Sequence, residues 1–361
     1  MAAPRAEDLF REALRSFDAG DLEAAAEGFA GVLRLDAAYA LAHYQLGNVR
    51  WDQHRAADAE EHFRASLALA PQHAESHNNL GILQQVSGRA DEAIASYARA
   101  TELAPALVQP HLNLGRLLVN QSRKDEAVRC YRRALGSSDN PPVFAHLLAA
   151  LEGSSPAAAP AEYVRMTFDG FAAQFDEHLV RDLGYRVPEA LARALARLQP
   201  AATGLDALDL GCGTGLCGAT VAATTRRLVG VDLSPGMLRQ ARARACYQEL
   251  FEADIVAWAQ AASPAQFDLI VAADVLIYLG ALEALFAALA RLARPRALFA
   301  FSLEVCADRD WRLQESGRYA HSPAYVERLA SAHGFAVASR AESPIRSPVV
   351  GLLYVLEAGA G

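Results

Sequence analysis

The chain has 361 residues, a hydrophobic fraction of 52% and a formal net charge of −8. The acidic balance excludes the broad basic surface on which non-specific nucleic-acid binding depends, and no uncharged apolar run reaches the roughly 18 residues that a membrane span needs. Five cysteines without a CxxC pair argue against a disulfide framework or a metal site, so we expect about two domains in a reducing cytoplasm.

The first 150 residues repeat with a period of 34 residues. A Leu-Gly pair and a later aromatic residue recur in register: Leu46-Gly47 with Phe63, Leu80-Gly81 with Tyr97, and Leu114-Gly115 with Tyr131. This pattern resembles the tetratricopeptide repeat (TPR), in which each unit is two antiparallel helices and neighbouring units stack, with the aromatics filling the space between units. We expect units at about 6–39, 40–73, 74–107 and 108–141, and a last helix over 142–153.

A change of pattern follows the repeats. Residues 153–162 are rich in Gly, Ser, Pro and Ala and predict a linker between a repeat domain at 1–152 and a second domain at 163–361. In the second domain, strand-like runs alternate with helical stretches. This alternation predicts a doubly wound, mainly parallel α/β sheet. The runs are ALDLG, RLVGVDL, QELFEAD, FDLIVAAD, ALFAFSL, FAVASR and GLLYVLEA.

The segment LDLGCGTG at 208–215 carries the strongest chemical signal. A strand, a glycine-rich turn and a helix follow one another there, which suits a ligand that approaches the backbone and a helix N-terminus. Asp232 closes the next strand, where a carboxylate can bind ribose hydroxyls. The same stretch also reads G-x-G-x-x-G from Gly213 to Gly218, so an NAD-dependent oxidoreductase is a serious alternative.

Three further features favour another cofactor. Asp209 precedes the loop in the form D-x-G-x-G-x-G, the third strand ends in an acidic Glu252-Ala-Asp254, and FDLIVAADVLIYL forms the fourth strand and its continuation. In order and spacing, these motifs resemble the class I S-adenosylmethionine-dependent methyltransferases over about 163–358. With the repeats, the whole chain resembles bacterial methyltransferases that carry TPR units. The resemblance implies a TPR solenoid followed by a Rossmann-like, seven-stranded methyltransferase domain.

The resemblance also implies which residues bind S-adenosylmethionine. The loop glycines would cradle its methionine part and Asp209 would orient its ammonium group. Asp232 would hold the ribose and Asp254 would accept from the adenine amino group, although either carboxylate could instead cap the helix that follows it. The implied set is Asp209, Gly211, Gly213, Gly215, Asp232, Leu233, Met237, Asp254, Ile255 and Ala273.

Two segments frame this site in the resemblance. The stretch 163–191 resembles the segment that precedes the catalytic fold, where Phe168, Phe171 and Phe175 would form a lid or pack in the core. The stretch 341–358 departs from the family pattern, because it is abbreviated between the last two strands. The loop there could shape the substrate pocket.

Methyl transfer requires an aligned nucleophile, exclusion of water and, for some acceptors, a base. The candidates for the base are His321, Tyr278, Tyr319 and Asp274, and His321 is favoured because histidine titrates near neutral pH. His321 could equally be a loop or capping residue. Arg318 could clamp a carboxylate or phosphate, or lie in solvent.

The substrate is less constrained by the sequence. Ala272–Val275 stands where enzymes that methylate amino groups carry N/D-P-P-Y/F, so we expect a small-molecule or carrier-bound acceptor, with oxygen favoured and nucleic acid disfavoured. A protein or peptide recruited by the TPR groove is the alternative, since Asn79 and Asn113 could form a ladder along a bound backbone or bond within the array. A non-catalytic scaffold and a homo-oligomer stay open.

Overall fold

The computed structural model describes residues 5–169, 176 and 184–360, and it separates into two compact units, one up to Ala145 and one from His146. The division falls inside helix α9 (Pro141–Glu152). Among the described residues, no helix is both long and apolar enough to cross a bilayer. All five cysteines are free thiols.

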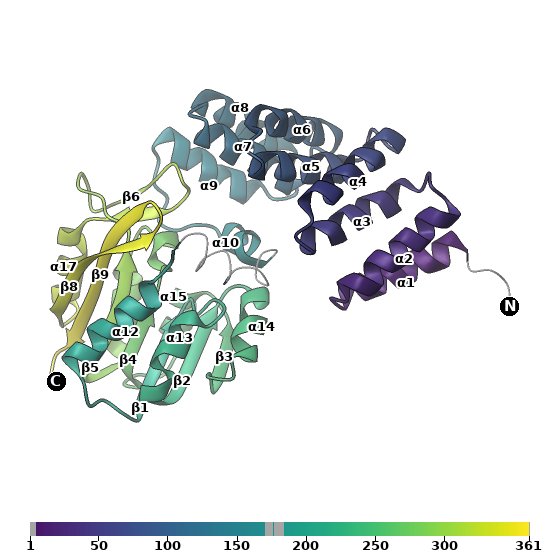
Figure 1. The fold of residues 1–361 in the computed structure, drawn as a ribbon. Coiled ribbons are helices and arrows are strands. Elements are labelled where there is room, and N and C mark those ends of the chain that lie inside the picture. Colours follow the sequence, from purple (N-terminus) through teal and green to yellow (C-terminus); the bar gives the residue numbers. More distant parts are fainter. Residues whose placement is uncertain (1–4, 170–175, 177–183, 361) are drawn as a thin grey trace. The chain divides into compact units, whose positions relative to one another are not determined.

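The first unit is the expected stack of antiparallel helix pairs (Figure 1). Each pair occupies one predicted repeat, so the period read from the sequence is confirmed. The helices are α1 (Ala6–Asp18), α2 (Leu22–Leu35), α3 (Ala40–Asp52), α4 (Ala56–Leu69), α5 (Ala74–Val86), α6 (Ala90–Leu103), α7 (Val108–Asn120) and α8 (Lys124–Ser137).

The recurring glycine and aromatic residue meet within one repeat. A Cβ atom at Gly47 would lie 2.6 Å from the Phe63 ring, and one at Gly81 would lie 2.7 Å from the Tyr97 ring. The glycine therefore allows the two helices of a unit to approach closely around the aromatic. We expected the aromatics to fill the space between units, and this is only part of the arrangement, since Phe63 packs on its own unit as well as on Leu80 of the next.

The amides on the inner helices form one hydrogen-bonded chain. Asn79 donates to Asn48 at 2.8 Å, Asn113 donates to Asn78 at 3.0 Å, and Asn78 donates to Asn79 at 3.0 Å. Gln45, which lies on the same helix as Asn48, accepts from Asn48 at 3.1 Å and extends the chain by one side chain. Of the two interpretations of these residues, the structure thus shows bonding within the array.

The second unit is built on a seven-stranded sheet with the order β3-β2-β1-β4-β5-β9-β8. Strands β1 to β5 run parallel, and β9 is antiparallel to both β5 and β8. This confirms the doubly wound, seven-stranded prediction. The strands are β1 (Leu205–Leu210), β2 (Thr225–Asp232), β3 (Glu249–Glu252), β4 (Phe267–Ala272), β5 (Ala293–Leu303), β8 (Phe335–Arg346) and β9 (Val349–Ala358).

Helices cover both faces of this sheet (Figure 1). Alternate side chains of each strand point to opposite faces, so Leu208 packs in one apolar cluster and Ala207 in the other. One cluster includes α15 (Ile255–Ala261), α16 (Glu283–Leu292) and α17 (Pro323–Ala332), and the other includes α12 (Val187–Leu198) and α13 (Leu216–Val221). Two further helices are α10 (Ala161–Phe168) and α14 (Pro235–Ala243).

The C-terminal part of the second unit contains one hairpin that was not predicted and one short connection. A separate antiparallel hairpin of β6 (Trp311–Leu313) and β7 (Tyr319–His321) was missed, because its three-residue strands are too short to show a periodic pattern. The connection between β8 and β9 consists of Ser347 and Pro348, and its abbreviation relative to the family pattern stays a prediction.

The segment predicted as a linker is bonded to the second unit. The hydroxyl of Ser155 accepts from the Leu313 backbone N–H at 3.0 Å, and the Pro156 carbonyl accepts from the Tyr319 hydroxyl at 2.7 Å. The Ala157 carbonyl accepts the backbone N–H groups of residues 280 and 281. The domain boundary itself stays a prediction.

Candidate functional site

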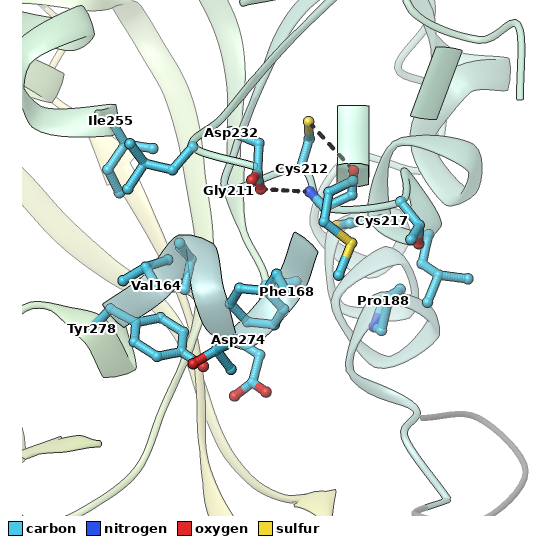
Figure 2. A pocket seen from close by; sticks show the side chains of 18 of the residues that line it. Val164, Phe168, Pro188, Gly211, Cys212, Cys217, Asp232, Ile255, Asp274 and Tyr278 are labelled. Atoms are coloured by element: carbon cyan, nitrogen blue, oxygen red, sulfur yellow. Dashed lines mark hydrogen bonds between the residues drawn. The ribbon is translucent and has the colours of Figure 1, made fainter. Parts of the chain in front are cut away.

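A pocket opens where the parallel strands β1, β2 and β4 end (Figure 2). Ligands of open α/β sheets bind in this place, beside the switch in strand order between β1 and β4. Most of the predicted set lines the pocket: Gly211, Gly213, Asp232, Leu233, Met237, Asp254, Ile255, Ala273, Asp274 and Tyr278. Asp209, Gly215, Tyr319 and His321 are not among the lining residues.

The glycine-rich loop has the backbone conformation that side chains resist. Gly211 and Gly213 have φ values of +62° and +54°, in the left-handed region. A Cβ atom at Gly211 would collide with Val275, whereas one at Gly213 would meet nothing within 4 Å. The loop therefore presents bare backbone and open space at Gly213, which is the cradle that a bound ligand needs.

Asp232 joins the loop to the turn that follows β2. Its carboxylate accepts from the backbone N–H of Gly213 at 2.9 Å, drawn as a dashed line in Figure 2. It also accepts from the backbone N–H of Ser234 at 2.8 Å. The cap of α14 is Ser234, whose hydroxyl accepts from Met237 N at 3.0 Å, so Asp232 is not the helix cap. Burial raises the pKa of Asp232. The carboxylate retains acceptor capacity for a ligand.

Asp254 caps the helix that follows it and also lines the pocket, and its contact with adenine stays a prediction. Its Oδ1 atom caps α15, accepting from Val256 N at 3.0 Å and Ala257 N at 2.9 Å. The residue also lines the pocket next to Ile255. Since Oδ1 takes both capping bonds, Oδ2 is the atom that can accept from a ligand.

The pocket lining also has an apolar part, the apolar slot. Met237 and Ile255 are buried in the protein and reach the pocket, together with Leu233. Val164 and Phe168 of α10 line it as well (Figure 2). Of the predicted phenylalanine lid, Phe168 therefore contacts the pocket, and Phe171 and Phe175 lie outside the described residues.

Asp209 supports the loop from behind. It is 1% exposed, and its Oδ2 atom accepts from the hydroxyl of Tyr247 at 2.7 Å. Burial raises the pKa of Asp209 to about 7. Because Asp209 is buried and is not among the lining residues of the pocket, we expect it to act on a ligand through the loop. Tyr247 was not predicted, because 38 residues separate it from Asp209.

The favoured base, His321, is misplaced for catalysis. It is fully buried, and its Nε2–H donates to the Gly280 carbonyl at 3.1 Å. Burial lowers the pKa of His321 to about 4. Tyr319 is likewise buried and donates to Pro156. Both residues brace the hairpin, which corrects the expectation that they face the substrate.

Asp274 and Tyr278 do reach the pocket, and they are joined there by two arginines, Arg318 and Arg346. Arg346 is 5% exposed in its side chain and bonds to both Asp274 and Glu304. Burial raises the pKa of Tyr278 to about 12, so its hydroxyl stays protonated. Sequence reasoning missed Arg346, which lies at the end of β8, 72 residues beyond Asp274.

Two aspartates, Asp169 at the end of α10 and Asp176, bond to residues around the pocket. Asp169 accepts from the hydroxyl of Ser234 and from Gly236 N, at the start of α14. Asp176 accepts from the hydroxyl of Thr214 and from Arg244. The bonds of Asp169 hold the end of α10 against the pocket.

Residues 208–299 match the family described as Methyltransferase domain, and residues 38–106 and 111–142 match tetratricopeptide repeat families. Residues 38–142 thus carry TPR repeats, and residues 208–299 belong to an S-adenosylmethionine-dependent methyltransferase domain. The match to a methyltransferase family decides against the NAD-dependent oxidoreductase alternative.

Individual relatives are similar over parts of the chain. Methyltransferase-like protein 27 of Homo sapiens is 40% identical over 85 residues, which is 23% of this chain and 34% of that protein, so the match spans about a third of the relative. The crystal structure of magnesium protoporphyrin IX methyltransferase from Synechocystis PCC 6803 covers 55% of this chain and 99% of its own, at 19% identity and a TM-score of 0.43. MamA covers 37% of this chain and 77% of its own, at 24% identity and a TM-score of 0.35.

Proposed function

We propose that the C-terminal domain transfers a methyl group from S-adenosylmethionine to an oxygen atom of a small-molecule or carrier-bound acceptor. The observation that carries this proposal is that the pocket has two chemically different ends. One end, the cofactor end, contains the glycine loop, Asp232 and the apolar slot. The other end, the acceptor end, contains Asp274, Tyr278 and two arginines. Figure 2 shows Asp232 and the loop apart from Asp274 and Tyr278.

The first end fits S-adenosylmethionine. Open space at Gly213 accommodates the methionine part, and Asp232 has acceptor capacity left for both ribose hydroxyls. Met237 and Ile255 offer apolar surface for the adenine, and Asp254 offers an acceptor beside it. When bound, the cofactor supplies an activated methyl group.

The chain's own contribution is then alignment and exclusion of water. Val164 and Phe168 line the pocket with apolar surface, and the bond of Asp169 to Gly236 N holds the end of their helix, α10, beside α14. Fixing the acceptor in line with the methyl group removes much of the entropic cost of a bimolecular step, and a dry pocket strengthens electrostatic interactions inside it.

The TPR repeats favour a second proposal, that the chain recruits a protein partner or a protein substrate. TPR solenoids expose extended surfaces for such contacts. The inner amides satisfy one another, and Asn78 is buried, so a peptide backbone would have to break existing bonds to use them. For this reason a protein acceptor ranks behind a small or carrier-bound one.

A reducing cytoplasm fits the five free thiols.

Isothermal titration of the full chain tests the proposed function. S-Adenosylmethionine and S-adenosylhomocysteine should each bind at one site, and NAD should not. Absence of binding by both sulfur compounds would contradict the proposal and favour a non-catalytic scaffold. Transfer of label from methyl-tritiated cofactor to nitrogen rather than oxygen would contradict the choice of acceptor atom alone.

A further inference from the structure

The β6–β7 hairpin delivers a guanidinium group to the wall of the pocket. Arg318 lies directly before β7, and the hairpin turn is closed by a bond from Gln314 N to the Arg318 carbonyl at 2.8 Å. A second bond runs from Gly317 N to the Gln314 carbonyl at 2.9 Å, and His146 donates to the Gly317 carbonyl at 2.9 Å. The backbone of Arg318 is thus fixed, and its half-buried side chain lines the pocket.

The carboxylates that act on Arg318 are already engaged elsewhere. Arg346 donates to both oxygens of Asp274 and to Oε1 of Glu304. The other oxygen of Glu304 accepts from Gln314 at 2.6 Å. Within the part of the chain that the structure describes, Arg318 has no carboxylate at salt-bridge distance, although its guanidinium lies close enough to the Tyr278 hydroxyl to donate to it.

This arrangement leaves the guanidinium donors of Arg318 without a direct carboxylate partner in the described chain, although Asp274 and Glu304 lie near enough to favour its charge. Removing a guanidinium from water is costly unless an anion pairs with it. Guanidinium groups match carboxylates and phosphates geometrically through parallel N–H donors. The charge therefore points to an anionic ligand at this end of the pocket.

The same end of the pocket has no free general base among its described lining residues. Asp274 is held by Arg346, and Tyr278 keeps its proton because burial raises its pKa. The remaining acids, Asp232 and Asp254, lie at the cofactor end. An acceptor that has to lose a proton would have to pass it to Asp274, which is already bonded to Arg346, whereas a carboxylate arrives ionised at neutral pH and needs no base.

We propose that the methyl acceptor is a carboxylate, which Arg318 and the Tyr278 hydroxyl hold, so that the product is a methyl ester. The proposal rests on the proposed methyltransferase function. Tyr278 can accept from Arg318 and donate its own O–H to one carboxylate oxygen, which leaves the other oxygen to react. A lone pair of that oxygen forms the bond to the methyl carbon as the carbon–sulfur bond breaks, and sulfur keeps the electron pair. A carboxylate and a sulfonium become a neutral ester and a neutral thioether, and no proton moves.

The test compares matched probes on the full chain loaded with S-adenosylhomocysteine. Hexanoate and benzoate are titrated against hexanamide and benzamide, which have the same shape without the charge. The carboxylates should bind more tightly by roughly 10- to 150-fold, the range of one charge-assisted hydrogen bond. Arg318→Met should remove this preference, Arg318→Lys should keep part of it, and Tyr278→Phe should reduce it. Arg242→Met is the matched control, because Arg242 is exposed and is not part of the pocket lining.

The outcomes separate this inference from the proposed function. Failure of the wild-type chain to bind S-adenosylhomocysteine defeats the proposed function. Normal binding of that compound without a preference for carboxylates over amides overturns the inference alone, as does an Arg318→Met variant that retains the preference. If Arg318→Met lowers the melting temperature, Tyr278→Phe decides the result. In labelling of a small-molecule extract with methyl-tritiated cofactor, the label should be released as methanol by alkali, and an alkali-stable product overturns the inference.

Discussion

The Nη1 atom of Arg346 donates to both carboxylate oxygens of Asp274, at 3.0 and 2.9 Å. Asp274 has a φ of +57°, a conformation that non-glycine residues rarely adopt, and its backbone N–H donates to the Ser302 hydroxyl at 2.8 Å. Strain of this kind persists when surrounding contacts fix the residue. Arg346 thus turns a potential base into a structural anchor at the acceptor end of the pocket.

Removing this arginine should be costly for stability. Arg346→Met leaves Asp274 and Glu304 buried without their cation, and breaking a buried ion pair on one side costs about 3–5 kcal/mol. Urea denaturation, followed by fluorescence, measures the change. Arg296→Met is the control, since the Arg296–Glu357 pair is mostly exposed and should contribute less than about 1 kcal/mol. Equal effects of the two substitutions would contradict the anchoring role.

Asp232 should control cofactor affinity in a pH-dependent way. Loss of a charge-assisted acceptor costs about 1.5–3 kcal/mol, so Asp232→Ala should weaken S-adenosylmethionine binding roughly 10- to 150-fold. Burial raises the pKa of Asp232. As the pH falls, Asp232 should therefore be protonated, and binding weakened, at a higher pH than for an ordinary aspartate. Titrations over a pH series check both points, and Asp232→Asn should bind weakly at every pH. Unchanged affinity in these variants would remove Asp232 from the site.

Alanine substitutions at two glycines can distinguish the effect of backbone strain from the loss of a ligand contact. Gly213 and Gly88 both have positive φ values, +54° and +76°, and a Cβ atom at either position would meet nothing within 4 Å. Alanine at either site should lower the free energy of unfolding by about 1 kcal/mol, because both positions require a left-handed backbone conformation that strains an alanine. Only Gly213→Ala should also weaken cofactor binding. If both variants bind the cofactor equally well, the loop glycines are turn formers without a ligand role.

Asp209 should make the fold more stable in mild acid than in mild base. Its pKa rises from an ordinary value near 3.8 to about 7 on burial, so between these values the folded state binds more protons than the unfolded state. The free energy of unfolding therefore falls as the pH rises through this window, by up to about 4 kcal/mol. Asp209→Asn, which stays neutral, should flatten this dependence in thermal denaturation at pH 5 and pH 8.

Asp206 supplies a control in which the pH dependence of stability has the opposite sign. Hydrogen bonds and charge from Arg226 and Arg294 lower its pKa, so it contributes stability above its ordinary pKa and loses it as the pH falls. Asp206→Asn should therefore destabilise the protein at pH 8 more than at pH 3. If the wild-type protein and Asp209→Asn show the same change in stability between pH 5 and pH 8, the assignment of this pH dependence to Asp209 is wrong.

The parts of the fold that the sequence predicted are those with local signals. The 34-residue period placed the helix pairs, and the apolar runs placed all seven strands of the main sheet. The glycine loop and Asp232 could be located because strand, turn and acidic residue follow in a fixed order. Their positions at one sheet edge then follow from parallel strand topology.

The acceptor end depends on contacts that have no local signal. Arg346 reaches Asp274 across 72 residues, and Tyr247 reaches Asp209 across 38. His321 was favoured from its typical pKa, but burial in the hairpin determines both its position and its charge. Such pairings depend on how β8 and the β6–β7 hairpin pack on the sheet, which composition and periodicity do not encode.

The segment before α10 should belong to the catalytic fold. Besides the bonds of Ser155, Pro156 and Ala157, the end of α9 places Ala150 in an apolar cluster with Leu313. Hydrogen bonds of this kind contribute about 1 kcal/mol each. A fragment that starts at Pro141 should thus bind S-adenosylmethionine as the full chain does, while one that starts at Ala161 should be less stable by roughly 2–5 kcal/mol.

Three fragments decide how the chain divides. Residues 141–361 and 161–361 are compared by thermal denaturation and by titration with S-adenosylmethionine, and residues 1–153 serve as the control that should be helical by circular dichroism and bind none. The shorter catalytic fragment should melt lower because the Leu313 N–H and the Tyr319 hydroxyl lose their acceptors inside the protein, and such groups are costly when left unpaired. Equal melting temperatures would show that residues 141–160 are a true linker. Failure of the longer fragment to bind the cofactor would instead make the repeat array part of the catalytic fold.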